Sequence, residues 1–353
     1  MVLTKQILWE IEMKIGLITG GGDAPGLNGI IKAAGRTLLH EGHEVLGILN
    51  GFEGIFEHKV RKIVLGDLHG LHAQAGTFLG ASNKSQVDGR EDEFVRKYKE
   101  LGLDGLILAG GDGSFRCMER VNKDVNVIGV PKTIDNDLPG TDMSFGFDTA
   151  CTVVADAMEA LWHTAEAHER IFFVEAMGRT AGWIALGGGL ASYADAILIP
   201  ERPFSLEELK KFLVDKRKRK KALLIAVAEG AHPIGEDVVF LSRSRDSNKN
   251  DRLGGIAEQL ATWVEDGTGL ECRHIVLGHL QRSHNPTTTD RLLTLNMGVR
   301  AAHLAIKESW GQAVVYRNGD IHNVPIHEIM GAPRLVPEGH AWIRKAHDLG
   351  IFI

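Results

Sequence analysis

The sequence predicts an α/β protein with two doubly wound domains, mostly parallel sheets and a cleft between the two domains. Short β-rich apolar runs that end in glycine or proline alternate with longer helical patterns, as expected for parallel strands joined by crossover helices. The alternation occurs twice, before and after about residue 147. The length of 353 residues accommodates two domains of roughly 150 residues each.

Eight apolar runs are predicted to be strands, and helical patterns lie between them. The predicted strands are Lys14–Ile18, Glu44–Leu49, Asp104–Ala109, Val125–Val130, Ile171–Glu175, Ala196–Ile199, Ala222–Ala228 and His274–Leu277. The predicted helices include Leu27–Leu39, Glu91–Leu101, Thr149–His168 and Ser205–Lys218. The last of these begins with Ser205 and Glu208 in the spacing of a capping box, which marks a helix start.

Glycine is over-represented, with 42 of 353 residues, about 12% where roughly 7% is usual. The glycines follow no collagen-like period and accompany only 10 prolines. Their surplus therefore indicates local backbone requirements, such as tight turns and close approach to a ligand.

Composition and charge exclude several classes of protein. A net charge of −6 disfavours a protein built to bind nucleic acid or an anionic membrane, and no run approaches the 18 apolar residues of a membrane span. Cys117, Cys151 and Cys272 lie far apart and form no C-x-x-C, which indicates reduced thiols in a cytoplasmic protein. Residues 1–12 lack the features of a signal peptide, and we expect them to form an extension before a fold that begins at Met13.

A first glycine cluster, Gly20-Gly21-Gly22, ends the first predicted strand and leads into a predicted helix. Strand, glycine turn and helix start together form an anion site, because exposed backbone N–H groups and the helix dipole favour negative charge. The cluster matches neither the dinucleotide-binding fingerprint nor the P-loop pattern. Taken alone, a tight turn without a ligand is an equally good interpretation.

A second cluster, Gly110-Gly111-Asp112-Gly113-Ser114, follows another predicted strand. Asp112 could bind Mg²⁺ through one carboxylate while backbone amides and Ser114 contact nucleotide phosphates. The alternative is an aspartate that stabilises a turn. Because open α/β sheets bind ligands at the carboxyl ends of their strands, two such loops favour phosphate chemistry.

The segment 131–137 (PKTIDND) places Asp135 and Asp137 two residues apart, beside Thr133 and Lys132. On an extended segment, residues i and i+2 face the same way. One carboxylate could then accept a proton from a substrate hydroxyl while the other orients the hydroxyl or meets metal. An aspartate with an ordinary pKa of about 3.9 is ionised at neutral pH and needs no special tuning for this role. An acidic turn is the alternative.

Cations gather at the ends of the later predicted strands, and a carboxylate ends one of them. Guanidinium groups bind phosphate bidentately, which suits a sugar phosphate, although any single one is also compatible with a surface ion pair. Glu229 could accept hydrogen bonds from sugar hydroxyls, or it could have a structural role. The cations are Arg170, Arg179, Arg273, His279 and Arg282.

Together these segments resemble the phosphofructokinase family, from about Met13 onward. They are GGGDAPGLN at 20–28, GTFLGAS at 76–82, GGDGS at 110–114, PKTIDND at 131–137, GFDTA at 146–150, MGRTAGWIA at 177–185 and VLGHLQR at 276–282. The resemblance implies the phosphofructokinase fold, Mg²⁺ as cofactor, and phosphoryl transfer to the 1-hydroxyl of fructose 6-phosphate. It also implies a homo-oligomer, expected to be a tetramer.

The resemblance also implies which part of the chain binds which substrate. One domain, 13–147 plus about 280–331, would bind nucleotide and Mg²⁺. The other, 148–279 plus about 332–353, would bind the sugar phosphate. The active-site cleft would lie between the two domains.

Residue roles follow from the resemblance, position by position. Asp135 resembles the catalytic base, Asp137 its partner, Thr133 a hydroxyl that positions phosphate, and Arg179 the cation that meets transition-state charge. On the nucleotide side the residues are Gly22, Gly113, Ser114, Asn83 and Lys84, with Asp112 for Mg²⁺. On the sugar-phosphate side they are Met177, Gly178, Glu229, His279 and Arg282, with Arg170 and Arg273 lent across a subunit interface.

Two positions bear on the phosphoryl donor. Family members that use pyrophosphate typically read GGDD, in which the extra carboxylate takes the space and charge of the nucleotide α-phosphate. Gly113 leaves that space open. Lys132 resembles the pyrophosphate-type lysine, although a subgroup of ATP-using members combines glycine with lysine. We therefore expect ATP, with pyrophosphate as the alternative.

Other functions stay open at this point. The family usually has Gly-Gly after the Gln281-Arg282 pair, whereas this chain has Ser283-His284, so a different acceptor sugar is an alternative. NAD kinase also uses GGDG but does not account for PKTIDND. A non-catalytic sugar-phosphate sensor is expected to lose groups such as Asp112, Asp135 and Arg179, all of which this chain retains.

Overall fold

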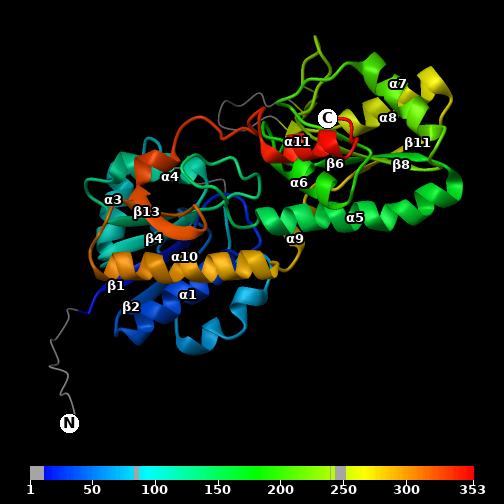
Figure 1. Cartoon of the computed structure of the whole chain (residues 1–353). Helices are drawn as coiled ribbons and strands as arrows, with labels where there is room; N and C mark the ends of the chain where they lie inside the picture. Colours follow the sequence, from blue (N-terminus) through cyan, green and yellow to red (C-terminus); the bar gives the residue numbers. More distant parts are fainter. Residues whose placement is uncertain (1–11, 83–86, 239, 243–251) are drawn as a thin grey trace.

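The structure, a computed structural model, describes residues 12–82, 87–238, 240–242 and 252–353. Two α/β units lie next to each other, each built on its own sheet (Figure 1). The expected extension at 1–12 lies outside the described residues except for Glu12, and Met13 is buried at the start of the first unit.

The sheet of the first unit has seven strands in the order β13-β12-β5-β4-β1-β2-β3. Its central strands are parallel, whereas β3 and β13 pair antiparallel at the two edges. The strands are β1 (Lys14–Thr19), β2 (Glu44–Ile48), β3 (Val60–Lys62), β4 (Gly105–Gly110), β5 (Val127–Pro131), β12 (Gln312–Arg317) and β13 (Asp320–Pro325).

The chain leaves β1 toward β2 on one side and reaches β4 and β5 on the other. The connection therefore changes direction between β1 and β4. In open α/β sheets such a switch point forms a crevice at the carboxyl ends of the strands, where ligands bind.

Helices cover both faces of the first sheet because its central strands are buried on both sides, as in other parallel sheets. All six residues of β4 are buried. The helices and short 3₁₀ turns of this unit are α1 (Leu27–His40), α2 (Glu53–Phe56), η1 (Leu65–Leu68), η2 (Leu71–Ala73), α3 (Glu91–Glu100), α4 (Asp112–Val121), α10 (Thr288–Ile306) and η3 (Ile326–Ile329). Helix α10 packs along α1, so this late segment belongs to the core of the first unit.

The second unit has a four-stranded parallel sheet in the order β11-β6-β8-β7 and a separate antiparallel pair, β9 with β10. Its strands are β6 (Ile171–Ala176), β7 (Ala196–Leu198), β8 (Leu223–Ala228), β9 (Phe240–Ser242), β10 (Arg252–Leu253) and β11 (Cys272–Val276). Its helices are α5 (Phe147–His168), α6 (Trp183–Ala191), α7 (Leu206–Arg217), α8 (Ile256–Thr268) and α11 (Ala341–Asp348). The Ser205 hydroxyl accepts from Glu208 N at the start of α7, so the predicted cap is present.

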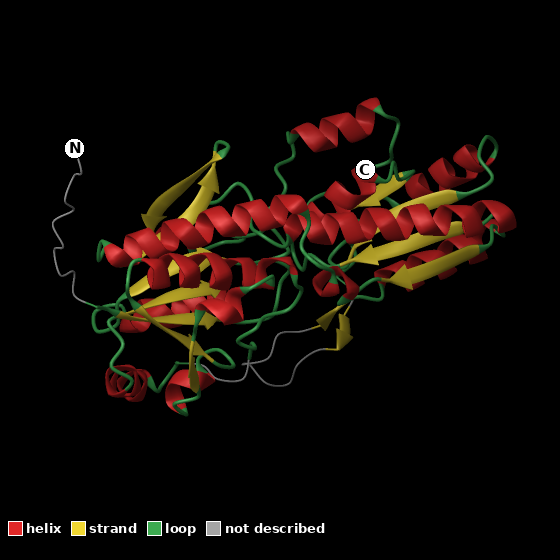
Figure 2. Cartoon of the chain, turned by 90° about the horizontal axis from the view of Figure 1, so that it is seen from below, coloured by secondary structure: helices red, strands yellow, loops and turns green. Residues whose placement is uncertain are grey.

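Three segments cross between the two units: residues 132–146 between β5 and α5, the short α9 (Leu280–Ser283), and residues 332–340. Helix α9 leads from β11 into α10, so that α5 and α10 run nearly end to end (Figure 2). The α5 N-terminus is tied to α10 by Asp290, whose carboxylate accepts from Gly146 N and Thr149 N. The chain then returns through residues 332–340 to α11, drawn in red in Figure 1.

The predicted fold class is confirmed, and all eight predicted strands are present within one or two residues of their predicted limits. Strands β3, β9, β10, β12 and β13 were not predicted. In the described part of the chain, no helix is both long and apolar enough to cross a membrane.

Candidate active site

The two glycine clusters meet at the switch point between β1 and β4. Gly20 N donates to Ala109 O over 2.8 Å, which joins the ends of the two strands. The Ser114 side chain is buried between the clusters. A Cβ on Gly20 would lie 2.5 Å from Ser114 Oγ, and one on Gly110 would lie 2.7 Å from Ser114 Cβ. Both positions therefore require glycine, and Ser114 sets the spacing of the two loops.

Helix α4 begins within the second cluster and presents Asp112 and Gly113 in its first turn. Asp112 Oδ2 pairs with Arg116 Nε at 2.9 Å, whereas its Oδ1 is buried without a hydrogen-bond partner among the described residues. A Cβ built on Gly113 meets nothing within 4 Å, so this position faces open space. One unpaired carboxylate oxygen could bind a Mg²⁺ ion that takes its other ligands from phosphates and water.

The segment that carries Asp135 and Asp137 forms a turn after β5. The expectation of an extended segment is wrong here, because Asn136 between them is left-handed with φ 54°. The Thr133 hydroxyl accepts from Asp135 N at 3.1 Å and donates to Asp137 Oδ1 at 3.2 Å. Asn136 Oδ1 in turn accepts from Ser144 N at 2.9 Å. A hydrogen-bonded turn therefore orients both carboxylates.

Burial dominates the electrostatics of the two aspartates. Asp135 is 5% exposed, and its Oδ1 has no hydrogen-bond partner in the described structure. Burial raises the pKa of Asp135, against the attraction of Arg282, Arg179 and Lys132. Burial, and then the charge of Asp135, raises the pKa of Asp137 to about 6. Asp135 therefore does not have the ordinary pKa expected from the sequence, and a raised pKa makes a carboxylate a better proton acceptor near neutral pH.

Lys132 connects this turn to the first glycine cluster. Its buried Nζ donates to Gly22 O over 2.6 Å. Burial, and then the charge of Arg282, lowers the pKa of the Lys132 ammonium to about 8. The lysine thus holds the Gly22 loop in place by a direct hydrogen bond.

The second sheet supplies residues from the ends of β6 and β8. Met177, Gly178 and Arg179 follow β6, and Glu229 follows β8. Glu229 Oε1 accepts from Arg179 N at 2.9 Å and Gly178 N at 3.3 Å. Arg179 has φ 53°, so the carboxylate stabilises a turn that would otherwise be strained. Met177 is half-buried and packs against the core of the second unit.

Arg282, on α9, contacts the first glycine cluster. Its Nη1 donates to Asp23 O over 2.6 Å, and a Cβ on Gly22 would lie 3.4 Å from the same nitrogen. His279 stands exposed just before α9. Ser283, where the family usually has glycine, is exposed and caps its own helix through Leu280 O.

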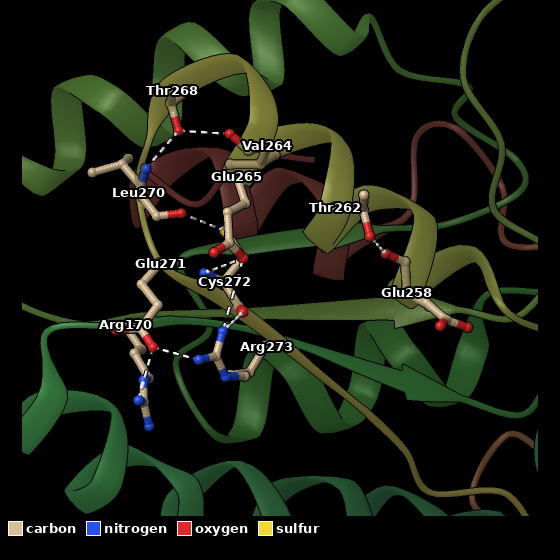
Figure 3. A network of polar contacts seen from close by, with 10 residues as sticks. All are labelled: Arg170, Glu258, Thr262, Val264, Glu265, Thr268, Leu270, Glu271, Cys272 and Arg273. Carbon is tan, nitrogen blue, oxygen red and sulfur yellow. Dashed lines mark hydrogen bonds and ion pairs between the residues drawn. The ribbon is translucent and has the colours of Figure 1, made fainter.

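Arg170 and Arg273 lie elsewhere within the chain, at the amino ends of β6 and β11. Figure 3 shows them in an ion network with two glutamates. Arg170 Nη2 pairs with Glu271 Oε1 at 2.7 Å, and Arg273 pairs with Glu271 and, at 3.8 Å, with Glu265. The structure therefore does not bring these two arginines to the site of their own chain. Asn83 and Lys84 lie outside the described residues.

Comparison with known proteins decides the family. The Phosphofructokinase family model matches residues 14–305. The chain belongs to the phosphofructokinase family. An ATP-dependent 6-phosphofructokinase of Chloroflexus aurantiacus is 41% identical over 96% of this chain and 97% of its own.

Other members of the family differ in donor and in length. A pyrophosphate–fructose 6-phosphate 1-phosphotransferase of Amycolatopsis mediterranei is 39% identical over 92% of this chain and 96% of its own. The structure of phosphofructokinase from Saccharomyces cerevisiae superposes with a TM-score of 0.79 at 28% identity, covering 90% of this chain. This chain spans 45% of that longer one.

Sequence reasoning missed one half-buried residue at the site of this phosphofructokinase, Arg334. Arg334 Nη2 donates to Asn136 O at 2.8 Å and to Asp142 O at 3.0 Å. It comes from residues 332–340, which lie almost 200 residues beyond the aspartates and contain no motif. Only the fold brings it to the turn.

The stability of this phosphofructokinase is expected to depend on Glu229 and pH. Burial is the main cause that raises the pKa of Glu229 to about 7 from 4.5. The folded state therefore binds this proton more tightly, and the wild type loses stability as the pH rises from about 4.5 to 7. Glu229→Gln removes the ionisation and keeps an oxygen that can accept from Arg179 N. The melting temperature of the variant relative to wild type should therefore rise across this window and level off above it. The total gain in stability is about 3 kcal/mol, because each pKa unit is worth about 1.4 kcal/mol.

Thermal melts from pH 4.5 to 8 measure this difference. Glu159→Gln, at an exposed position on α5, is the matched control and should follow wild type throughout. A Glu229→Gln curve parallel to wild type would show that burial does not hold the proton on Glu229.

Proposed function

We propose that this phosphofructokinase is ATP-dependent and transfers the γ-phosphoryl group of ATP to the 1-hydroxyl of fructose 6-phosphate, giving fructose 1,6-bisphosphate and ADP. The proposal is supported by the match of the family model and by a relative of that name at 41% identity. We assign the nucleotide to the unit of 13–147 plus about 280–331, and the sugar phosphate to the unit of 148–279 plus about 332–353.

The observation that carries the proposal is the position of Asp135. Its buried carboxylate has an oxygen without a partner among the described residues. Lys132, three residues before it, binds the Gly22 loop, and the charges of Arg179 and Arg282 are close enough to oppose the rise of its pKa. A desolvated carboxylate close to cations is arranged to accept a proton from a hydroxyl that attacks a phosphorus atom.

In this mechanism Asp135 accepts the proton of the acceptor hydroxyl as that oxygen forms its bond to the γ-phosphorus, while the bond from the γ-phosphorus to the bridging oxygen breaks and that oxygen leaves with ADP. Thr133 and Asp137 hold the turn that carries it. The Gly22 N–H and the Arg179 guanidinium stabilise the charge that spreads over the transferred group. Phosphoryl transfer has a loose transition state, so positioning and charge account for most of the catalysis.

Mg²⁺ belongs to the proposal as well. Asp112 is the residue that would hold it, since one of its oxygens is buried and unpaired in the described structure. The ion supplies neutralisation of phosphate charge. In the described residues no group of three or more His, Cys, Asp or Glu could hold a metal, which agrees with a site that relies on phosphate and water ligands.

The donor assignment rests on Gly113 rather than on Lys132. The open space at Gly113 leaves room for the α-phosphate of a nucleotide. The Lys132 ammonium donates to Gly22 O, which gives the lysine a structural role that is compatible with either donor. The open space at Gly113 therefore favours ATP, although a pyrophosphate-using relative is 39% identical.

We further propose a homo-oligomer, expected to be a tetramer, in which Arg170 and Arg273 contribute to a neighbouring subunit's sugar-phosphate site. Both lie away from the site of their own chain and are held by Glu271. A cytoplasmic location is supported by three free cysteine thiols, Cys117, Cys151 and Cys272.

A parallel assay of donors and acceptors tests the function. Purified protein with Mg²⁺ and fructose 6-phosphate should turn over with ATP, and kcat/KM for ATP should exceed that for pyrophosphate at least ~10-fold, a difference of about 1.4 kcal/mol. Other sugar phosphates, offered with ATP, test the acceptor beside Ser283 and His284. Faster turnover with pyrophosphate, or with another sugar phosphate, would overturn the corresponding half of the proposal.

A further inference from the structure

The segment 332–340, here called the C-terminal crossover, lies against residues of both units. It leaves the first unit after η3 and enters the second at α11 (Figure 1). Loops usually run over the surface because their backbone polar groups need water. In this crossover, however, Val336 is buried and Arg334 is half-buried, so these two residues anchor the segment in the structure.

On the side of the first unit, Arg334 binds the turn that carries the catalytic aspartates. Its backbone N donates to Asp137 O over 2.6 Å. Its Nη2 donates to Asn136 O and to Asp142 O. These three bonds surround Asn136, whose backbone is left-handed. A non-glycine residue keeps this unfavourable conformation only where several surrounding contacts hold it.

On the side of the second unit, the same residue binds the start of α6. The Arg334 guanidinium lies 4.4 Å from the centre of the Trp183 ring, and Trp183 Nε1 donates to Arg334 O over 2.8 Å. Two residues further on, Val336 N donates to Glu201 Oε1, which also accepts from Gly182 N. Gly182 and Trp183 directly follow the turn of Arg179.

Arg334 therefore contacts two segments that come from different sheets. One contains the proposed base, Asp135, and the other leads from the proposed transition-state cation, Arg179. Hydrogen bonds to two carbonyls together with stacking on an indole need a planar guanidinium, which a lysine cannot reproduce.

We propose that Arg334 is a positioning residue that sets the separation of Asp135 and Arg179 for phosphoryl transfer. This inference rests on the proposed function for its kinetic readout. Substrate binding should be affected much less than the chemical step, because Arg334 holds the backbone of the turn rather than a substrate. A misplacement of about 1 Å at reacting groups can cost on the order of 100-fold in rate.

The test compares Arg334→Met and Arg334→Lys with Arg344→Met, a control on the neighbouring α11 whose arginine is exposed and bonds to Gly339 O. We expect Arg334→Met to lower kcat by roughly 10- to 100-fold while each KM changes less than about threefold, with Arg334→Lys in between. Arg344→Met should match wild type. If Arg334 had a purely structural role, Arg334→Met would lower the melting temperature and leave kcat per folded molecule unchanged.

Hydrogen–deuterium exchange of the substrate-free proteins gives a readout that does not depend on activity. Faster exchange is expected in both 133–145 and 177–186 for Arg334→Met, and in neither for Arg344→Met. If wild type fails to use ATP and fructose 6-phosphate, the proposed function fails, while the exchange result still tests whether Arg334 holds the two segments. A kcat within about twofold of wild type, or exchange unchanged in these segments, would overturn the inference. If Arg334→Met does not fold, Arg334→Lys decides by the same two measurements.

Discussion

Replacing Asp135 with asparagine should lower kcat by roughly 10²- to 10⁴-fold, the usual contribution of a general base. The amide keeps the size of the side chain but cannot accept the proton. Its Oδ1 can still lie where the buried carboxylate oxygen lies. The loss should therefore appear in kcat, with a smaller change in KM for either substrate, and a steady-state assay at saturating substrate measures it.

The same variant should be as stable as wild type or more stable. Burial raises the pKa of Asp135, which means that the ionised side chain is unfavourable in the folded protein above its unfolded pKa. The neutral amide removes that cost at neutral pH. Asp156→Asn, at an exposed position on α5, is the matched control and should keep full activity. An unchanged kcat in the Asp135→Asn variant would refute the assignment of Asp135 as the base.

Replacing Gly113 with aspartate should reduce kcat/KM for ATP by roughly 10²- to 10³-fold. A Cβ at Gly113 meets nothing within 4 Å, so the new side chain enters open space without a clash. If the α-phosphate lies about 4 Å away, the two like charges repel by about 4 kcal/mol at an effective dielectric constant near 20. Pyrophosphate has no such group and should lose much less.

Gly113→Asn separates charge from size, because it adds the same volume without the negative charge. We expect its kcat/KM for ATP to stay within ~10-fold of wild type. Donor assays with ATP and pyrophosphate for wild type and both variants provide the measurement. Equal losses in the two variants would mean that steric exclusion, rather than charge, governs the donor at this position.

The sequence was sufficient to predict the parallel cores of both units and most of the candidate site. The predicted strand Asp104–Ala109 corresponds to β4, whose residues are all buried. Central strands of a parallel sheet are covered on both faces, so their sequence shows a continuous apolar run. The edge strand β13, Asp320–Pro325, alternates exposed and partly buried residues and gave no comparable signal. The two glycine loops were found because strand, glycine and helix start follow one another in sequence.

What the sequence did not predict depends on contacts between distant residues. The turn at Asn136 and its bond to Arg334 join positions 198 residues apart. The raised pKa of Asp137 arises from burial and from Asp135, and burial is a property of the packed structure. Glycine had a second role as well, since a Cβ on Gly29 would lie 2.2 Å from Thr294 Oγ1. That glycine lets α1 pack against α10 rather than forming a phosphate loop.

The division of the site between two sheets has a consequence for how this family diversifies. The residues on the donor side of the proposed site follow strands of the first sheet; they are Gly22, Asp112 and Gly113. The residues on the acceptor side follow strands of the second sheet; they are Met177, Arg179 and Glu229. Mutations that alter donor preference therefore need not disturb the acceptor pocket. The same fold can then change its phosphoryl donor while it keeps its acceptor sugar. Relatives named for ATP and for pyrophosphate occur at nearly the same sequence identity to this chain.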